Sequence, residues 1–195
     1  MRCALLLVHT LVLGSTATLG QAPTWENIHS RARGELCTAR AEVGSVPNHF
    51  PNAASRSTTG HSRREVQETI RRQACGMGII PAIPLAVSSV ESGFDPSARS
   101  GTDARGVMQV EPETARQFGA DPERLFEPEY GIHTGLTVMR DLLDYYDGWI
   151  PGVLAAYYAG RGFSGTQSPE VRADILHYVH KVYEQLPRFA QYRCR

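Results

Sequence analysis

The sequence has no excess of charge of either sign and only one lysine. Its 195 residues include 20 Lys and Arg against 20 Asp and Glu, which gives a formal net charge of zero. Lys181 is the single lysine, and the other basic residues are Arg. A chain without a basic excess offers no electrostatic reason to expect nucleic-acid binding.

The sequence also lacks an apolar run long enough to cross a membrane. The apolar run near the N-terminus, residues 4–13, contains two polar residues and is too short to span a bilayer. Arg2 precedes it and small residues follow, so we expect residues 1–20 to be a secretory signal cleaved after Ala17 or Gly20. The mature protein is then expected in the periplasm, without stable membrane insertion, carrying 19 basic and 20 acidic residues after loss of Arg2.

Cysteine is scarce, and one of the four cysteines, Cys3, lies in the expected signal. Cys37, Cys75 and Cys194 remain, and three is an odd number. In an oxidising compartment we expect one pair to form a disulfide and the third thiol to be free or bonded to another chain. The spacing does not decide which two are paired.

No stretch alternates apolar and polar residues for long, so the pattern gives no reason to expect a sheet. Residues 21–65 divide into a weakly periodic segment, 21–43, that favours a helix, and a segment rich in Ser, Thr, Asn, Pro and Gly that indicates a linker. A single domain is expected over residues 66–195. Apolar spacing and proline positions predict helices near residues 64–76, 81–91, 112–118, 132–143, 153–159 and 175–186.

Three further expectations concern the connections between these helices. Residues 95–105 should form a loop because of their Pro, Ser, Gly and Asp content. Asp121-Pro122 and Glu127-Pro128 should form turns, and Pro187 should end the last helix. The domain is therefore predicted to be all-α.

Glu91 stands out because it closes an apolar segment, residues 84–90, just before Gly93 and Pro96. A glutamate at the edge of a cleft is desolvated, which raises its pKa above the value of about 4.3 of a free glutamate. A carboxyl that stays protonated near neutrality can act as a general acid. A helix-terminal glutamate facing solvent is the alternative that this segment alone leaves open.

Four short motifs occur in order: Glu91-Ser-Gly-Phe-Asp-Pro96, Gly106-Val-Met-Gln109, Ala156-Tyr-Tyr-Ala-Gly160 and Asp174-x-x-x-Tyr178-Val179. Together they resemble the catalytic domain of the soluble-type lytic transglycosylases, over roughly residues 66–186. The interval from Glu91 to Gly106 fits that family as well. The resemblance implies a lysozyme-like helical domain with a catalytic cleft for peptidoglycan strands.

The resemblance implies that Glu91 is the only catalytic acid. It would protonate the glycosidic oxygen between N-acetylmuramic acid and N-acetylglucosamine. Ordinary glycosidases need a second carboxylate, but here the N-acetyl group of the substrate would assist at the anomeric carbon. Its C6 hydroxyl would then attack, giving a 1,6-anhydro sugar, and Glu91 would take up the hydroxyl proton. No metal or cofactor is implied.

Further residues match substrate-binding positions of the family. Ser92 is expected beside the catalytic acid, where it would orient the N-acetyl group, or else to bond the backbone at the helix end. Met108 and Gln109 match a pair that lines the cleft, with Gln109 as a hydrogen-bonding partner for sugar, although Met108 taken alone indicates a core residue. Tyr157 matches the tyrosine whose hydroxyl contacts the catalytic acid, and Tyr178 matches a tyrosine near the cleft.

The sequence departs from the family pattern at three positions. Tyr158 stands where the family has Asn, so a bulky phenol replaces a small amide that could contact sugar. Gly131 replaces another Asn, and Asp174 replaces Glu. The change at Tyr158 would affect a sugar subsite or the rate without touching the acid.

Two other functions remain open at this point. If Asp95 or Asp103 served as a second carboxylate, the protein would be a hydrolase like goose-type lysozyme. If Tyr158 prevented cleavage, the protein would be a non-catalytic wall-binding component of a secretion machine.

A metal site at His177 and His180 is not expected, because no third ligand is evident. The favoured interpretation is a monomeric lytic transglycosylase that opens the peptidoglycan wall for a secretion or conjugation apparatus.

Overall fold

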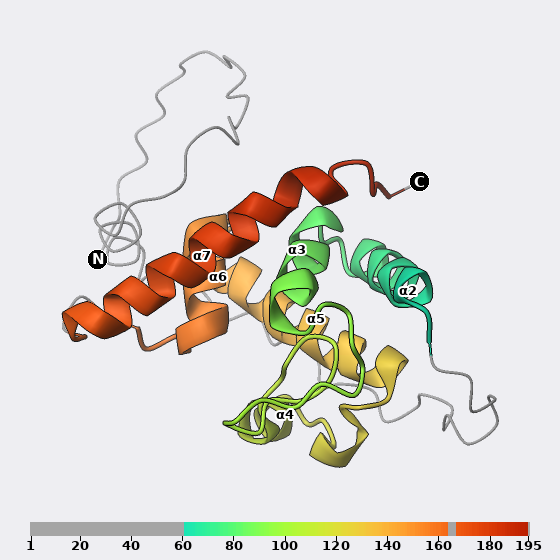
Figure 1. Ribbon diagram of the computed structural model, residues 1–195, viewed down its shortest axis with the longest axis horizontal. Coiled ribbons are helices and arrows are strands. Elements are labelled where there is room, and N and C mark those ends of the chain that lie inside the picture. The colour runs from blue at the N-terminus through green and yellow to red at the C-terminus, as the bar shows by residue number, and fades with distance from the viewer. Residues whose placement is uncertain (1–60, 164–166, 195) are drawn as a thin grey trace, which may run out of the picture.

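The computed structural model describes residues 61–163 and 167–194. Their regular elements are helices, labelled in Figure 1: α2 (Arg63–Gly76), α3 (Ala82–Glu91), α4 (Pro112–Gln117), the 3-10 helix η2 (Pro122–Arg124), α5 (Pro128–Tyr145), α6 (Ile150–Ala159) and α7 (Pro169–Phe189). No strand occurs in these residues, which contain only isolated bridges at Arg105. None of the described helices is long and apolar enough to cross a membrane. The expected signal, the segment 21–43 and Cys37 lie outside the described residues.

Local sequence explains where the helices begin. Ser62 and Glu65 form a capping box at the start of α2, in which each side chain accepts a hydrogen bond from the other's backbone N–H. Proline occupies the first turn of α4, α5, α6 and α7, where its missing N–H costs no helical hydrogen bond.

Two expectations about proline are wrong. Pro128 opens α5, where the sequence predicted a turn, so this helix begins four residues before the predicted start. Pro187 does not end the last helix, because α7 continues to Phe189. A proline removes one backbone hydrogen bond and crowds the preceding turn, and this disturbance is tolerated within the final turn of a helix.

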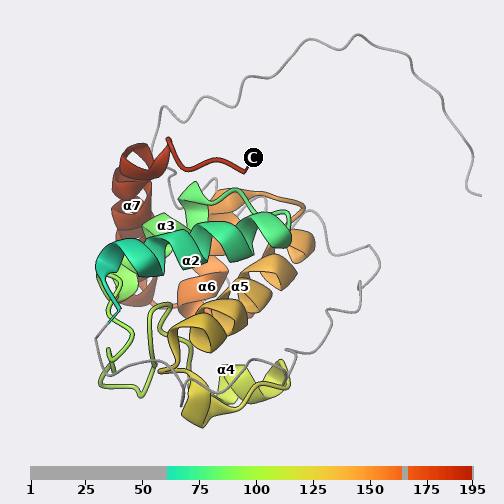
Figure 2. The same ribbon diagram turned by 90° about the vertical axis from the view of Figure 1, so that its right-hand side faces the viewer.

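The apolar helix α3 lies at the centre of the helical core. Residues 83–88 are all buried, and α3 packs against α7 on one side and α2 on the other. α5 contacts α2 and α6, and α6 contacts α7. Figure 1 shows α7 running along the molecule beside α6 and α3, and Figure 2 shows α2 and α5 together on the other side. The C-terminal residue of α3, Glu91, is thereby held against α7.

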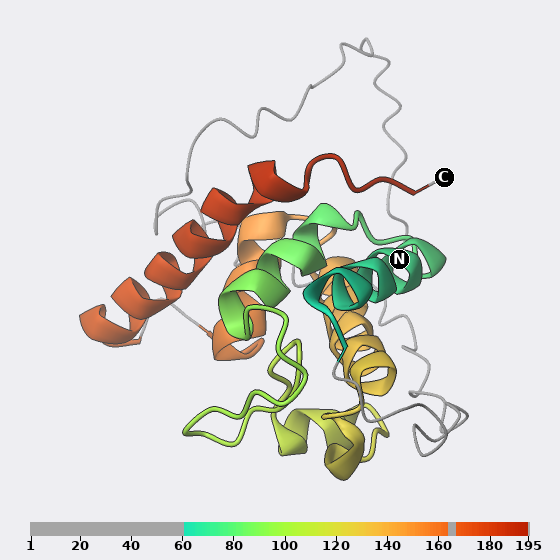
Figure 3. The same cartoon turned by 45° about the vertical axis from the view of Figure 1, so that its right-hand side comes forward.

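The segment between α3 and α5 lies beyond the C-terminal end of α3 (Figure 3). Arg105 holds its parts together. The guanidinium donates to Asp103 at 2.9 Å, to Glu123 at 2.9 Å and to the carbonyl of Pro122 at 3.0 Å. The predicted loop 95–105 is confirmed, and this network fastens it to η2.

Three glycines let residues 106–108 and α5 approach closely. A Cβ atom on Gly106 or on Gly131 would overlap the carbonyl oxygen of Leu125, and one on Gly135 would lie 2.6 Å from the Cβ of Met108. The glycine at 131, where the family has Asn, therefore fits the path of this chain, which leaves no room for any side chain there.

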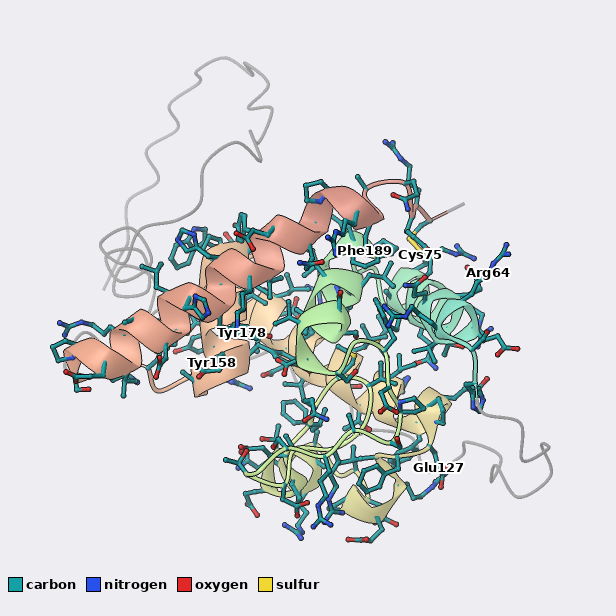
Figure 4. The ribbon with its side chains drawn as sticks, viewed as in Figure 1. Arg64, Cys75, Glu127, Tyr158, Tyr178 and Phe189 are labelled. Atoms are coloured by element: carbon teal, nitrogen blue, oxygen red, sulfur yellow. A yellow bond between two sulfur atoms is a disulfide. The ribbon has the colours of Figure 1, made fainter. Side chains whose placement is uncertain are left out.

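The Cys75–Cys194 disulfide joins the end of α2 to the C-terminal tail (Figure 4). The tail is also held by a hydrogen bond between the Tyr192 hydroxyl and the Gln67 side chain, 3.0 Å long, and by one from Arg71 to the carbonyl of Arg193. This pairing resolves the alternatives that the cysteine spacing left open.

We expect Gly131→Ala to lower the free energy of unfolding by about 1–3 kcal/mol, because the new methyl group collides with backbone that has no alternative position. Urea denaturation would measure the loss. Gly76→Ala is the matched control: Gly76 ends α2 with open space around it, so its variant should be at least as stable as the parent. Equal stability of both variants would contradict the close packing at Leu125.

Removing the disulfide with the double variant Cys75→Ser/Cys194→Ser should lower the free energy of unfolding by about 2–4 kcal/mol. The bond closes a long loop, with a sequence separation of 119 residues, so it strongly restricts the unfolded chain. Urea denaturation with and without reductant would measure this. Reductant should destabilise the parent and leave the double variant unchanged, and insensitivity of both would contradict the pairing.

Candidate active site

Glu91 is the last residue of α3, and its side chain is only partly exposed. Burial raises the pKa of Glu91 from 4.5 to about 7. The desolvation arises because the apolar residues that precede Glu91 place it at the edge of the core. Near neutrality the carboxyl is therefore distributed between its protonated and ionised forms, as a group that must give up and regain a proton requires.

Tyr178 of α7 makes the direct contact with this carboxyl. Its hydroxyl donates to Oε1 of Glu91 at 2.6 Å, across 87 residues of sequence. This hydrogen bond stabilises the carboxylate and partly offsets the effect of burial on the Glu91 pKa. Tyr178 is 6% exposed, and burial together with the Glu91 charge raises its own pKa well above the ordinary value, so it remains a donor.

The chain turns sharply directly after Glu91. Gly93 and Phe94 both have positive φ, of 60° and 71°. Phe94 is buried, its ring packs edge-on against Phe189 of α7, and its N–H is bonded to the Ser92 hydroxyl at 3.1 Å. This anchoring holds a non-glycine residue in a conformation that L-residues rarely adopt, and it fixes where α3 ends.

Ser92 ties the end of α3 to the second motif. Its hydroxyl donates to the carbonyl of Val107 at 2.7 Å while it accepts from Phe94. This is the backbone-bonding role that the sequence left as the alternative for Ser92. A contact between Ser92 and the N-acetyl group of a substrate stays a prediction.

Tyr157 does not make the contact that the resemblance implied. Its hydroxyl donates to the carbonyl of Met108 at 2.9 Å, and the hydroxyl bond to Glu91 comes from Tyr178 instead. The reason is geometric, because α3 packs along α7, whereas Tyr157 on α6 reaches the 106–110 segment. The Glu91 charge still contributes, after burial, to raising the pKa of Tyr157.

Met108 and Gln109 are occupied within the protein. Met108 is 1% exposed and belongs to the core, which is the place that its side chain taken alone suggested, and its part in lining a cleft stays a prediction. Gln109 has a φ of 49°, and its amide nitrogen donates to the carbonyls of Ala98, at 3.1 Å, and Gly106, at 2.9 Å. Gln109 thus closes the loop onto itself, and its binding of sugar stays a prediction.

Tyr158 is the one member of the predicted set with a large exposed surface. Its side chain is 50% exposed, and its ring stacks on Tyr178 with centroids 4.8 Å apart (Figure 4). The sequence identified the residue as a departure from its family. The sequence could not show that Tyr158 stacks on Tyr178, the tyrosine that bonds Glu91.

The two carboxylates considered as a second catalytic group have other partners. Asp95 accepts from the backbone and hydroxyl of Ser97. Asp103 pairs with Arg105 and Arg99, and hydrogen bonds from these two arginines lower its pKa to about 2. A group with so low a pKa is a poor base. Among the described residues, no group of three or more His, Cys, Asp or Glu could hold a metal ion.

Sequence reasoning missed the backbone carbonyls that organise the site. The carbonyls of Val107 and Met108 accept from Ser92 and Tyr157 respectively, so one short segment is held from α3 and from α6. No side-chain pattern marks a carbonyl acceptor. The only available signal was the glycine at position 106, which permits this path.

Comparison with known proteins agrees with the fold. The 70 kDa soluble lytic transglycosylase of Escherichia coli matches with a TM-score of 0.53 and 21% identity, covering 65% of this chain and 24% of that one. An inactive mutant of the lytic transglycosylase Slt of Pseudomonas aeruginosa matches with a TM-score of 0.53 and 24% identity, covering 66% and 25%. The lysozyme-like helical fold predicted from the sequence is confirmed.

Curated relatives give the same indication at higher identity. The membrane-bound lytic murein transglycosylase C of Serratia proteamaculans is 32% identical over 133 residues, which are 60% of this chain and 35% of the relative. The protein of the same name from Actinobacillus pleuropneumoniae is 31% identical over 137 residues, covering 64% and 37%. The chain thus spans little more than a third of the length of these relatives.

The profile of the transglycosylase SLT domain family matches residues 68–174, which is more than half of the chain. The match begins within α2, includes Glu91 and the three motifs through Gly160, and ends on α7 just before Tyr178. The chain belongs to the transglycosylase SLT domain family.

Proposed function

We propose that this chain is a lytic transglycosylase that cleaves the β-1,4 bond between N-acetylmuramic acid and N-acetylglucosamine in peptidoglycan. The observation that carries the proposal is the partly buried Glu91, whose pKa of about 7 and hydrogen bond from Tyr178 suit a group that gives and then takes a proton. Membership of the family and the names of the similar proteins support the substrate.

Glu91 acts first as an acid in this reaction. The Tyr178 hydrogen bond occupies Oε1, and Oε2 accepts no hydrogen bond from the described residues, so Oε2 is the oxygen assigned to carry the proton. The proton passes to the glycosidic oxygen as the bond from that oxygen to the anomeric carbon breaks. The N-acetyl carbonyl of the substrate supports the positive charge that develops at this carbon.

Glu91 then acts as a base. The C6 hydroxyl of the same sugar attacks the anomeric carbon, and its proton returns to Glu91. The products are a 1,6-anhydro sugar and a free 4-hydroxyl, no water is consumed, and the enzyme regains its starting state. Asp103 is engaged by Arg105 and Arg99, which favours this route over hydrolysis by a two-carboxylate mechanism that would use Asp103.

The cellular setting is part of the proposal. An apolar segment with small residues after it at the N-terminus supports export to the periplasm, where peptidoglycan lies. The small size of the domain supports local opening of the wall for a secretion or conjugation apparatus. Normal assembly of every envelope machine in a deletion strain would overturn this last part.

Digestion of purified peptidoglycan should release anhydro-muropeptides with the parent protein, and Glu91→Gln should reduce the rate at least about 100-fold, because an amide has no proton to transfer. Mass spectrometry distinguishes the two reaction classes, since an anhydro product is lighter than a hydrolytic product by one water. Hydrated products from the parent would make it a lysozyme. No product from the parent, with strand binding retained, would make it a wall-binding protein.

The rate should fall as the pH rises through about 7, because only protonated Glu91 can donate. Initial release of anhydro-muropeptides, measured across this pH range, would show the midpoint. Tyr178→Phe should move that midpoint upward, because it removes the hydrogen bond that lowers the Glu91 pKa. A rate that rises through pH 7 would contradict the role of Glu91 as acid.

The melting temperature gives an independent control for this pH dependence. The folded-state pKa of about 7 lies above the ordinary value of 4.5, so the stability contributed by protonated Glu91 is present below 4.5 and is lost as the pH rises through 7. The melting temperature of Glu91→Gln should therefore exceed that of the parent by an amount that grows over this interval and then levels off. A constant difference would contradict the raised pKa.

A further inference from the structure

Two adjacent tyrosines of α6 point in different directions. Neighbouring residues on a helix do not face the same side. Tyr157 points to the carbonyl of Met108, whereas the ring of Tyr158 stacks on Tyr178, with an interplanar angle of 24°. Tyr178 in turn donates to Glu91 at 2.6 Å. Tyr158 is therefore separated from the catalytic carboxyl by a single side chain.

The stacking explains why the exposed ring of Tyr158 is held in place. Tyr178 is 6% exposed and fixed by its hydrogen bond to Glu91, so it provides a rigid support for one face of Tyr158. The remaining surface of Tyr158, half of the side chain, is open to solvent. A ring that is ordered before binding loses little conformational entropy when a ligand covers its open surface.

The chemistry of this surface suits a sugar. A pyranose ring presents a patch of C–H groups on its face and hydroxyl groups at its edge, and an aromatic ring offers apolar area for the first with a polar hydroxyl at its end for the second. Burial of the two apolar surfaces against each other is favourable. The asparagine found at this position in the family has no such surface.

We propose that Tyr158 is a specificity-determining residue that stacks on the pyranose ring of an N-acetylated sugar next to the bond that Glu91 cleaves. This inference rests on the function proposed above, and it assigns recognition at this subsite to an apolar surface in place of an amide. Tyr158 makes no contact with the proton that is transferred, so its contribution lies in binding.

The test is an NMR titration with a soluble β-1,4-linked tetramer of N-acetylglucosamine, carried out on the full chain in the Glu91→Gln background so that nothing is cleaved. Tyr158→Phe should bind the tetramer within about 2-fold of the Glu91→Gln protein because it keeps the ring. Tyr158→Leu, which keeps apolar cover over Tyr178, and Tyr158→Asn should each weaken binding by about 3- to 10-fold.

Tyr145 supplies a matched control. It is 46% exposed, close to the value for Tyr158, but its ring contacts Tyr146 and Arg161. Tyr145→Leu should leave binding unchanged. Melting temperatures of all variants, measured in the same buffer, report whether each is folded.

Unchanged binding by Tyr158→Leu and Tyr158→Asn would overturn the stacking role, and so would an equal loss in Tyr145→Leu. Peptidoglycan digestion separates this result from the proposed reaction. If the parent releases anhydro-muropeptides while both Tyr158 variants bind normally, the reaction stands and the role of Tyr158 fails. If both variants lose affinity and the parent releases no product, Tyr158 is confirmed as a sugar-binding residue and the reaction fails.

Discussion

The hydrogen bond between Tyr178 and Glu91 joins the two helices on which the candidate site depends. Packing of α3 against α7 takes the Glu91 carboxyl partly out of water, which raises its pKa to about 7, and brings to it a buried hydroxyl that moderates the shift. Both effects have one cause, since the apolar residues that draw α3 into the core also place its last residue against α7. The raised pKa of Glu91 and the packing of the core therefore have the same origin.

A second constraint is the close packing of residues 106–110 beside α3 and α7. Gly106, Gly131 and Gly135 leave room for backbone and for Met108, while Ser92 and Tyr157 bond carbonyls of the segment from two helices. Several motif residues that suggest substrate contacts therefore hold the protein's own backbone. The motifs occur together because each one positions another, and Glu91 depends on all of them for its surroundings.

The relationship to known transglycosylases extends to the fold and the motifs. The matched residues cover little more than a third of the length of the similar proteins. Where the chain departs from the family, the structure gives two different accounts. At Gly131 the carbonyl of Leu125 leaves no room for a side chain, whereas Tyr158 adds exposed aromatic surface next to Tyr178, which bonds Glu91.

The sequence by itself determined the helical class and the six predicted helices, and it identified Glu91 as the candidate acid, because apolar spacing, prolines and short motifs are local signals. Two local expectations were wrong, because Pro128 opens α5 instead of lying in a turn and the final turn of α7 tolerates Pro187. The resemblance assigned to Tyr157 a bond that Tyr178 makes. Only the tertiary structure decided that bond, the Cys75–Cys194 pairing and the stacking of Tyr158. Each of these joins residues distant in sequence, and which of several equivalent side chains meet is fixed by how the helices pack.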